Sequence, residues 1–505
     1  MWSFYFLGKL YLYFRGFIHF NFLLNLLFLV FILLPVPEKI SFSRQVRTAK
    51  TFISVIVAVL LLWYDSWLPP FLYSIRSLVQ VGIPSKEYVV RFLMDFVNPL
   101  ELLVLLGILV FCFLIRNRVR LTPVIVILIL IVPLLELRHP KEDMEGYLDS
   151  FYQAESKRVI HFEKPKTADS AFDIVILHVC SIAWDDLKEM VQEKDRFFRQ
   201  FDILFTNFNS ATSYSDPSAI RVLLSNCGQK KYGALYQNPP KECYLLETLR
   251  EQGYETFSAV DNDASTTTFV EHIITFGMAD SPIELKGIPV MQYNYDNTPI
   301  YDDLAILEKW WDIRQKSKSE RAAIYFNITT LHGGAHWANE KDWWRRVETI
   351  RYKEFIQNLF TNLEIFFNNL SASGRNFVVV FVPEHGRASH DTMIQAKGLR
   401  DIPLPSITLV PVGIKLIGKG HPLMPVQHET ISKPTSYLAI SYLLSSFLKD
   451  PPFGSRSLQP SVLADIPETG FVSENEETQV VQKGSDYYFY GKDKKWIRIS
   501  PSSSK

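Results

Sequence analysis

Apolar residues dominate the first 137 positions of this 505-residue chain, where they form four runs without Asp, Glu, Lys or Arg. Each run predicts a membrane-spanning helix, although most are shorter than the ~20 residues that comfortably span a bilayer. Tilt, or flanking Trp and Arg residues, has to supply the missing length. Four such runs in one part of the chain favour a membrane region over the buried helices of a soluble protein. The runs are Phe17–Leu34, Thr51–Tyr64, Leu102–Ile115 and Leu121–Leu135.

Basic residues predict how these helices are oriented. Residues 36–50 carry four Lys or Arg side chains and residues 116–120 carry three, and loops rich in Lys and Arg stay in the cytoplasm. We therefore expect the loop 65–100, and the chain after the last apolar run, to lie on the opposite side of the membrane. Segment Phe4–Ile18 contains two basic residues and is a poor candidate for a fifth crossing, which would bring the N-terminus inside. No small-residue cleavage site follows the first run, so we expect no cleaved signal peptide.

From Phe172 onward, short apolar runs alternate with longer amphipathic segments. Short runs that are apolar on both faces predict buried strands, and their alternation with helical segments predicts an α/β domain with a largely parallel central sheet. Segment Val347–Leu370 keeps apolar residues at helical spacing, as expected of a helix packed on a sheet. The strand candidates are Asp173–Cys180, Glu255–Val260, Ala322–Ile328 and Asn376–Val382.

The same patterns divide the chain into four parts. The polar stretch after the membrane region has amphipathic spacing, which predicts a linker helix near the membrane surface; its apolar residues are Tyr147, Leu148, Phe151 and Tyr152. Late strand candidates predict a small antiparallel appendage; they are Thr478–Val481, Asp486–Tyr490 and Lys495–Ile499. The predicted parts are an α-helical transmembrane region 1–137, a linker 138–170, an α/β domain 171–450 and a C-terminal extension 451–505.

The balance of charged residues limits the kinds of binding partner. Lys+Arg and Asp+Glu both number 53, so nothing indicates nucleic acid or another polyanion as a partner.

The cysteines of the chain have different surroundings. Cys112 lies in an apolar run and is most simply a small buried residue. Cys227 and Cys243 are sixteen positions apart in a polar stretch. In an oxidising compartment they would be able to form a disulfide, and otherwise they are two thiols.

Several predicted strands run directly into residues that bind metals or phosphate. The first ends at Cys180, a later one leads to His332, and the last leads to Glu384 and His385. The carboxyl ends of parallel strands meet at one edge of a sheet, where active sites collect. Thiolate, carboxylate and imidazole groups are all common zinc ligands. The alternatives are a buried structural thiol at Cys180 and a salt-bridged loop pair at Glu384 and His385.

Ser215 is a candidate nucleophile. It precedes Asp216 and Pro217 at the start of a helical run, so its simplest interpretation is an N-cap residue. The other interpretation uses the same position, because the N-terminus of a helix attracts a phosphoryl group. A serine hydroxyl needs activation at neutral pH, and a zinc ion can supply it. Cys180, Ser215, Glu384 and His385 would then form one tetrahedral site.

Segments across nearly the whole chain resemble the BcsG family of cellulose phosphoethanolamine transferases, within the alkaline phosphatase/sulfatase-like superfamily. The matching segments are ILHVCSIAW, FTNFNSATSYSDPSAIRVL, SNCGQ, CYLLETL, TPIYDDLAIL, VPEHG and GLRDIPLPSIT. The resemblance implies a multi-pass protein of the bacterial inner membrane with a periplasmic zinc-dependent catalytic domain. It implies transfer of phosphoethanolamine from phosphatidylethanolamine to the glucose 6-hydroxyl of nascent biofilm cellulose, alongside subunits of the cellulose synthase complex.

The resemblance also implies roles for individual residues. Ser215 would be the nucleophile and, with Cys180, Glu384 and His385, a zinc ligand. Cys227 and Cys243 would form a periplasmic disulfide. The further functional positions implied are Tyr214, which would orient phosphate or merely pack; His332, which would protonate the leaving group or anchor phosphate; and Arg400, which would bind phosphate through its bidentate fork. Without the family, an ordinary surface ion pair is the alternative for Arg400.

Two positions depart from the family pattern, and neither is a proposed ligand. Asp216 follows the nucleophile where a small residue is familiar, and the loop after Gly386 begins with Arg387 and Ala388. An extra acid beside an incoming phosphate would slow the reaction or alter its specificity.

Three alternatives remain open from the sequence. A sulfatase would need a C/S-x-P-x-R motif, but position 219 is Ala and the arginine comes at 221. A related transferase would carry phosphoethanolamine to lipid A by the same chemistry. A membrane scaffold of the synthase complex would need no catalysis at all, although all four proposed ligands are present.

Overall fold

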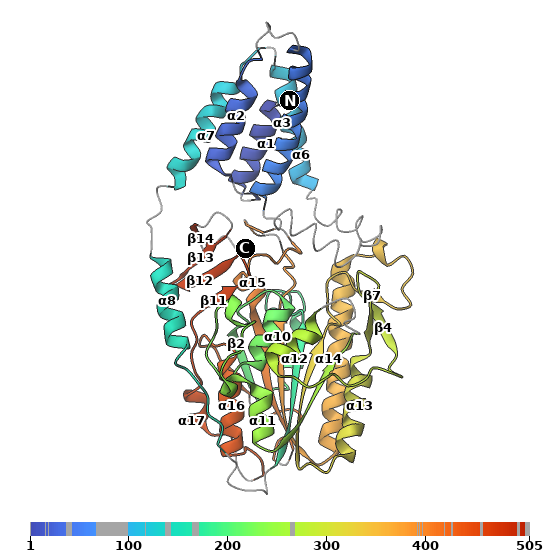
Figure 1. Ribbon diagram of the computed structural model, residues 1–505. Helices are drawn as coiled ribbons and strands as arrows, with labels where there is room; N and C mark the ends of the chain where they lie inside the picture. The colour runs from blue at the N-terminus through green and yellow to red at the C-terminus, as the bar shows by residue number, and fades with distance from the viewer. Residues whose placement is uncertain are drawn as a thin grey trace. The chain divides into compact units, whose positions relative to one another are not determined.

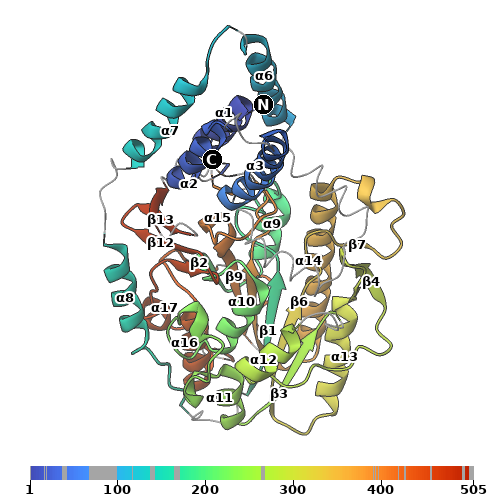
Figure 2. The same ribbon diagram turned by 45° about the horizontal axis from the view of Figure 1, so that its top comes forward.

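A computed structural model describes most of the chain and forms two compact units (Figures 1 and 2). The N-terminal unit consists mainly of residues up to Asp143, and the C-terminal unit consists mainly of residues from Met144 onwards. The described residues are 2–15, 17–18, 20–36, 43–66, 99–116, 118–136, 143–163, 171–262, 268–390, 392, 394–395, 397–418, 420–425, 428–454, 458–491 and 495–499. Most of the loop 65–100, predicted to lie outside the cytoplasm, falls outside these ranges.

All four apolar runs of the N-terminal unit contain helices. Within the described residues, a single helix, α3, is long and apolar enough to cross a membrane by length and composition, and the candidate span is its segment Gln45–Asp65. The other apolar helices are shorter, so the number of crossings and their orientation remain predictions. The helices of this unit are α1 (Trp2–Phe14), α2 (Phe22–Leu33), α3 (Ser43–Asp65), α6 (Pro99–Ile115) and α7 (Thr122–Glu136).

The basic residue within α1 lies inside the helical bundle. The ammonium group of Lys9 is 2.8 Å from a carboxylate oxygen of Asp65 and 2.9 Å from the side-chain oxygen of Asn25. Both members of the ion pair are fully buried. Because a buried charge requires a partner, this pair accounts for a lysine within an apolar segment.

The C-terminal unit is built around a seven-stranded sheet in the order β10-β2-β9-β8-β1-β6-β3. β9 runs antiparallel to both of its neighbours, and the other strand pairs are parallel. The predicted α/β class with a largely parallel sheet is therefore confirmed. The strands are β1 (Phe172–Cys180), β2 (Ile203–Asn209), β3 (Tyr254–Val260), β6 (Arg321–Ile328), β8 (Asn376–His385), β9 (Leu409–Ile417) and β10 (Glu429–Ile431).

Helices cover both faces of this sheet, which explains why its central strands are apolar throughout (Figures 1 and 2). Along β1, Ile174 and Ile176 belong to one hydrophobic core, and Val175 and Leu177 belong to the other. The first core contains residues of α10 (Ser215–Leu223), α11 (Leu245–Glu251), α12 (Phe269–Gly277) and α16 (Leu438–Lys449). The second contains residues of α9 (Val191–Phe198), α13 (Asp303–Lys316) and α14 (Glu348–Ala372), the last of which confirms the predicted helix.

A smaller antiparallel sheet follows at the C-terminus, and its last three strands match the predicted appendage. Its strands are β11 (Val472–Glu474), β12 (Gln479–Lys483), β13 (Asp486–Tyr490) and β14 (Trp496–Ile499). The predicted amphipathic helix is α8 (Met144–Glu155), but its apolar face has a different partner from the expected membrane surface. Leu148 and Tyr152 pack against Val472, Val481 and Tyr488 of this sheet. The apolar pattern of α8 therefore reflects burial within the C-terminal unit.

The remaining elements are short. A three-stranded sheet consists of β4 (Val290–Tyr293), β5 (Pro299–Tyr301) and β7 (His336–Trp337), and two short helices are α15 (Pro405–Thr408) and α17 (Pro460–Ala464).

Candidate functional site

Three potential metal ligands meet where two neighbouring strands end. β1 and β8 pair in parallel, and this register places Cys180 opposite His385. The ligand atoms of Cys180, Glu384 and His385 all lie within 4.8 Å of one another, and all three residues are buried. Cys180 Sγ is 3.9 Å from His385 Nε2. The structure thus brings together side chains that are about two hundred positions apart in the chain.

Ser215 completes the cluster. It is the first residue of α10, and the N-cap position belongs to Tyr214. The N-cap interpretation of Ser215 is therefore wrong by one position. The Ser215 hydroxyl instead donates to Cys180 Sγ at 3.7 Å and lies 3.4 Å from His385 Nε2. A sulfur, a hydroxyl, a carboxylate and an imidazole converge on one point at the N-terminus of a helix.

Two buried acidic groups, the Glu384 carboxyl and the Cys180 thiol, make this cluster suited to a cation. Burial raises the pKa of the Glu384 carboxyl to about 7 and raises the pKa of the Cys180 thiol. Glu384 Oε1 accepts a hydrogen bond from Asn327, whereas the buried Oε2 has no hydrogen-bond partner among the described residues. An unsatisfied buried carboxylate oxygen is rare in native proteins. A metal ion would complete its coordination and stabilise both anionic ligands.

His385 presents the correct nitrogen for such an ion. Its Nδ1 lies 2.9 Å from the carbonyl oxygen of Gly386, so we assign the proton to Nδ1 and the lone pair to Nε2. Burial and the charge of Arg400 hold the pKa of His385 well below its ordinary value, so the ring is neutral. A donor set of one sulfur, one nitrogen and two oxygens fits zinc in tetrahedral geometry.

A network of buried hydrogen bonds supports the backbone of Glu384. His178 Nδ1 lies 2.8 Å from the Tyr325 hydroxyl, and His178 Nε2 lies 3.2 Å from Ser218 Oγ. Ser218 in turn donates to the Glu384 carbonyl oxygen at 3.1 Å. The sequence interpretation did not single out His178 or Asn327. The available signal was a polar residue within an otherwise apolar buried strand.

Arg400 and Tyr214 lie beside the cluster. Arg400 Nη1 is 3.0 Å from both ring nitrogens of His385. The Arg400 guanidinium also lies 5.9 Å from the centre of the Tyr214 ring. Tyr214 donates its hydroxyl proton to Asp401 at 2.8 Å. This contact holds Tyr214 against the loop that carries Arg400.

His332 occupies a position at the same edge of the sheet, after β6. Its ring stacks on Tyr295 with 5.8 Å between the ring centres. Burial and the positive charge of Arg400 lower the pKa of His332 to about 4. None of the hydrogen bonds described for His332 reaches the four-residue cluster. A role in protonating the leaving group or anchoring phosphate would therefore depend on contact with the substrate itself.

Asn475 links the nucleophile loop to the loop of Arg400. Its side-chain nitrogen donates to Ser213 Oγ at 2.7 Å, to the Asp401 carbonyl at 2.9 Å and to the Arg400 carbonyl at 3.2 Å. Its side-chain oxygen accepts from Thr212 Oγ1 at 3.0 Å. This residue of the C-terminal extension gave no signal in the sequence, because its role depends on where the last sheet packs.

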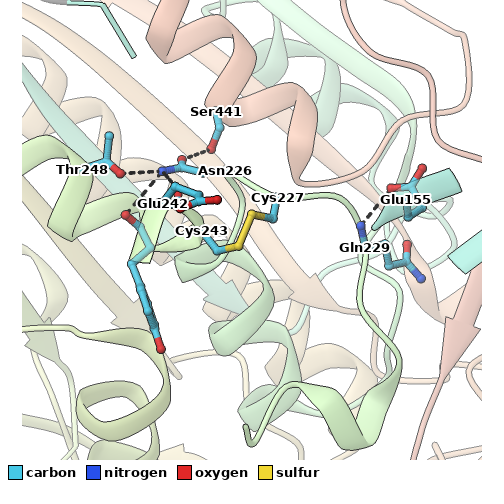
Figure 3. The surroundings of a disulfide bond; sticks show 9 residues. Glu155, Asn226, Cys227, Gln229, Glu242, Cys243, Thr248 and Ser441 are labelled. Atoms are coloured by element: carbon cyan, nitrogen blue, oxygen red, sulfur yellow. Dashed lines mark hydrogen bonds between the residues drawn. A yellow bond between two sulfur atoms is a disulfide. The ribbon is translucent and has the colours of Figure 1, made fainter. Parts of the chain in front are cut away.

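The disulfide lies in the same unit as the site, with an S–S distance of 2.04 Å between Cys227 and Cys243 (Figure 3). Beside it, the Asn226 side chain donates to Thr248 Oγ1 at 2.9 Å and accepts from Ser441 Oγ at 2.8 Å (Figure 3). The pairing expected from the family resemblance is thus present. It fixes the segment that follows α10 to the segment just before α11.

Comparison with solved structures shows only distant similarity. The chain aligns with a protein in the alkaline phosphatase superfamily from Vibrio parahaemolyticus, with 13% identity, a TM-score of 0.47 and coverage of 72% of this chain and 90% of that one. It also aligns with the C-terminal periplasmic domain of EcEptC from Escherichia coli, with 13% identity, a TM-score of 0.44 and coverage of 69% and 98%. These alignments are too distant to assign any residue or activity.

Sequence comparison is decisive for the family. Two models match, the N-terminal domain of cellulose biosynthesis protein BcsG over residues 2–134 and its C-terminal domain over residues 136–496. The Escherichia coli K12 cellulose biosynthesis protein BcsG is 31% identical over 552 residues, covering 99% of this chain and 94% of that protein. The Salmonella typhimurium LT2 protein is 31% identical over 539 residues, covering 96% and 94%. The resemblance noted in the sequence is confirmed, and the chain belongs to the BcsG family of cellulose biosynthesis proteins.

Proposed function

We propose that this protein transfers phosphoethanolamine from phosphatidylethanolamine to the glucose 6-hydroxyl of nascent cellulose. The convergence of Ser215, Cys180, Glu384 and His385 is the observation that supports a metal-dependent phosphoryl transfer most directly. Family membership supplies cellulose as the context of the acceptor. The protein would act in the inner membrane, with its catalytic domain in the periplasm and cellulose synthase subunits as partners.

The residues divide the chemistry between them. Zinc, when bound by Cys180, Ser215, Glu384 and His385, would favour the alkoxide form of Ser215 and withdraw charge from the phosphate. The Ser215 oxygen attacks phosphorus and forms a P–O bond, while the P–O bond to diacylglycerol breaks. Arg400 binds the phosphate oxygens, and phosphoryl transfer depends chiefly on such placement and charge stabilisation.

Protons and the second step close the cycle. The proton that leaves the Ser215 hydroxyl passes to the diacylglycerol alkoxide as it departs. His332, neutral because its pKa is about 4, is the group proposed to relay this proton. The glucose hydroxyl then attacks phosphorus of the phosphoethanolamine–serine intermediate and forms a new P–O bond to the sugar. The P–O bond to Ser215 breaks, and the proton of the sugar hydroxyl returns to the Ser215 oxygen. The Tyr214 hydroxyl is hydrogen-bonded to Asp401, which fixes the position of the tyrosine ring. Tyr214 would help to orient the phosphate from that position.

A lipid donor gives the N-terminal unit a role. The phosphate of a phospholipid lies at the bilayer surface, so anchoring the catalytic unit there keeps the site near its donor. The acceptor is the less constrained part of this proposal, because lipid A would serve the same chemistry.

The test uses the full-length protein in detergent with phosphatidylethanolamine labelled in its head group. We expect the wild-type protein to release diacylglycerol and to carry the label on the peptide containing Ser215. Ser215→Ala should lose both, whereas Ser156→Ala, which changes an exposed serine of the same unit, should retain both. Full head-group transfer by Ser215→Ala, with normal folding and zinc content, would rule out the covalent scheme. Cellooligosaccharide and lipid A acceptors, offered separately, distinguish the proposed acceptor from its alternative.

A further inference from the structure

A cavity of about 580 Å³ opens beside the nucleophile and is separate from the four-residue cluster. Asp216, the residue after Ser215, lines it, together with two tyrosines, a histidine and two glutamates. α10 and α12 lie side by side (Figure 1), and α12 contributes His272. The lining residues that matter here are Asp216, Tyr232, Tyr236, His272, Glu474 and Glu476.

The cavity carries an excess of negative charge. Three carboxylates line it, against a single lysine, Lys231. The Lys231 ammonium lies 3.3 Å from Asp149 and 5.3 Å from the centre of the Tyr152 ring, two residues outside the lining. Lys231 is therefore paired with a carboxylate, Asp149, that does not line the cavity. A hollow with this balance attracts a cation.

Asp216 is held in place from one side only. His272 Nδ1 donates to Asp216 Oδ2, and the two side chains keep 26% and 28% of their accessible area. Asp216 Oδ1 has no hydrogen-bond partner among the described residues. Oδ1 itself is shielded from solvent, while the Asp216 side chain as a whole is part of the cavity lining.

Aromatic rings also line the cavity. Tyr232 and Tyr236 have their ring centres 5.6 Å apart, and Tyr236 is also 5.6 Å from the His272 ring. Tyrosine faces attract ammonium groups through the ring quadrupole. Carboxylates and tyrosine rings together form a typical recognition site for an organic cation.

The position of this cavity matches the shape of the donor head group. In phosphoethanolamine the ammonium group is two carbons from the ester oxygen on phosphorus, so its binding site has to begin beside the nucleophile. Arg400 and the proposed zinc would face the negative phosphate, and the acidic cavity would face the positive amine. Asn475 borders the cavity and also holds the nucleophile and Arg400 loops, so both halves of the head group would meet one rigid frame.

We propose that this cavity binds the ammonium group of the ethanolamine donor and that Asp216 is a specificity-determining residue. The inference rests on the proposed function and names the feature of the donor that the site selects. Donors whose head group lacks a positive charge, such as phosphoglycerol esters, would lose this interaction.

The test compares two chromogenic esters of matched size with the full-length, zinc-loaded protein in detergent. In p-nitrophenyl phosphoethanolamine the chain ends in an ammonium group, and in p-nitrophenyl propyl phosphate a methyl group replaces it. Asp216→Asn should lower kcat/KM for the ethanolamine ester by about ten- to a hundredfold, the range expected for loss of a charge-assisted hydrogen bond. The propyl ester should change by less than about threefold.

Two further variants separate charge from position. Glu476→Gln removes an exposed charge of the cavity and should lower the preference for the ethanolamine ester in the same direction. Glu477→Gln makes the same change at the next residue, which is exposed and does not line the cavity, and should leave both esters unaffected. An equal loss on both esters in Asp216→Asn, or no loss on either, would overturn the proposal.

A binding measurement keeps this inference distinct from the proposed function. Calorimetry with phosphoethanolamine and with propyl phosphate needs no turnover, and we expect tighter binding of phosphoethanolamine that Asp216→Asn removes. Equal binding of the two phosphates would reject the ammonium site even if the transferase activity is confirmed. Selective binding without turnover of either ester would reject the transferase and retain the site. Binding of cellotetraose that Asp216→Asn weakens, with unchanged ester selectivity, would assign the cavity to the acceptor and contradict the proposal.

Discussion

The side-chain nitrogen of Asn475 donates to Ser213 Oγ at 2.7 Å, which ties the end of β11 to the loop that precedes the nucleophile. Asn475→Ala would leave several buried polar groups of the two catalytic loops without partners, and each such loss costs about 1–3 kcal/mol of stability. We expect a lower thermal midpoint and at least about tenfold lower transfer, since misplaced catalytic groups lose rate steeply. Zinc content should stay near that of the wild type, because Asn475 makes no contact with Cys180, Glu384 or His385 among the described hydrogen bonds.

Asn207→Ala is the matched control for this change. The Asn207 side chain makes an exposed hydrogen bond to Ser432, so its loss should have little effect on activity. Full activity in Asn475→Ala, or loss of zinc together with activity, would contradict a positioning role.

The fold was predictable where burial leaves a simple pattern. β1 and β8 are apolar on both faces because helices cover both sides of the sheet. The prediction for β1 is correct to within one residue at each end, and the prediction for β8 has the correct start but ends three residues early. β9 was not predicted, because Pro411 and Lys415 interrupt its apolar run. Lys415 is fully buried and donates to the carbonyl oxygens of Gln200 and Leu423 at 2.8 and 2.6 Å. Only the folded structure shows that these acceptors are present.

The candidate site was predictable from strand ends, but its supports were not. Cys180, Glu384 and His385 end strands that pair directly, so sheet topology brings them together. Asn327 and Asn475 act through hydrogen bonds between segments that are far apart in the chain. Nothing in a single sequence specifies which distant loop an asparagine will meet.

The buried Lys9–Asp65 pair should stabilise the N-terminal unit only while both partners are present. Lys9→Met leaves a buried, unpaired carboxylate and should cost about 3–5 kcal/mol, whereas the double change to Met and Leu should be closer to the wild type. Thermal unfolding in detergent of both single variants and the double variant measures the difference. Arg15→Met, which breaks the pair with Glu101 in which Arg15 is 52% exposed, is the control and should cost less than about 1 kcal/mol. Strictly additive losses in the double variant would contradict this expectation.

The Cys227–Cys243 disulfide should stabilise the C-terminal unit. The two residues are separated by 16 positions, and closing a loop of about this length contributes about 3 kcal/mol by restricting the unfolded chain. Cys227→Ser with Cys243→Ser should therefore lower the thermal midpoint and leave the zinc content unchanged. Reductant should lower the midpoint of the wild type and have no further effect on the double variant. If reductant lowered the thermal midpoint of both proteins equally, the effect of reductant would not arise from this disulfide.

Zinc should stabilise the protein more at neutral pH than in acid. Without metal, burial raises the pKa of Glu384 from 4.5 to about 7, and an acid with a raised pKa stabilises the fold only while it is protonated. The metal-free protein therefore loses this contribution as the pH rises from 4.5 towards 7. Zinc requires the ionised carboxylate and the thiolate of Cys180, so its binding releases protons and strengthens as the pH rises. Burial and the charge of Arg400 hold the pKa of His385 well below its ordinary value, which favours the neutral ring that zinc requires.

The measurement is the increase in thermal midpoint on adding zinc, taken at several pH values between about 5.5 and 8. We expect the increase to grow with pH in the wild type and to grow less in Glu384→Gln, because an amide has no proton to release. Cys180→Ser should retain the dependence that arises from Glu384, since only the thiol is changed. An increase that is the same at every pH, or one that Glu384→Gln leaves unaltered, would show that this carboxylate does not bind the ion.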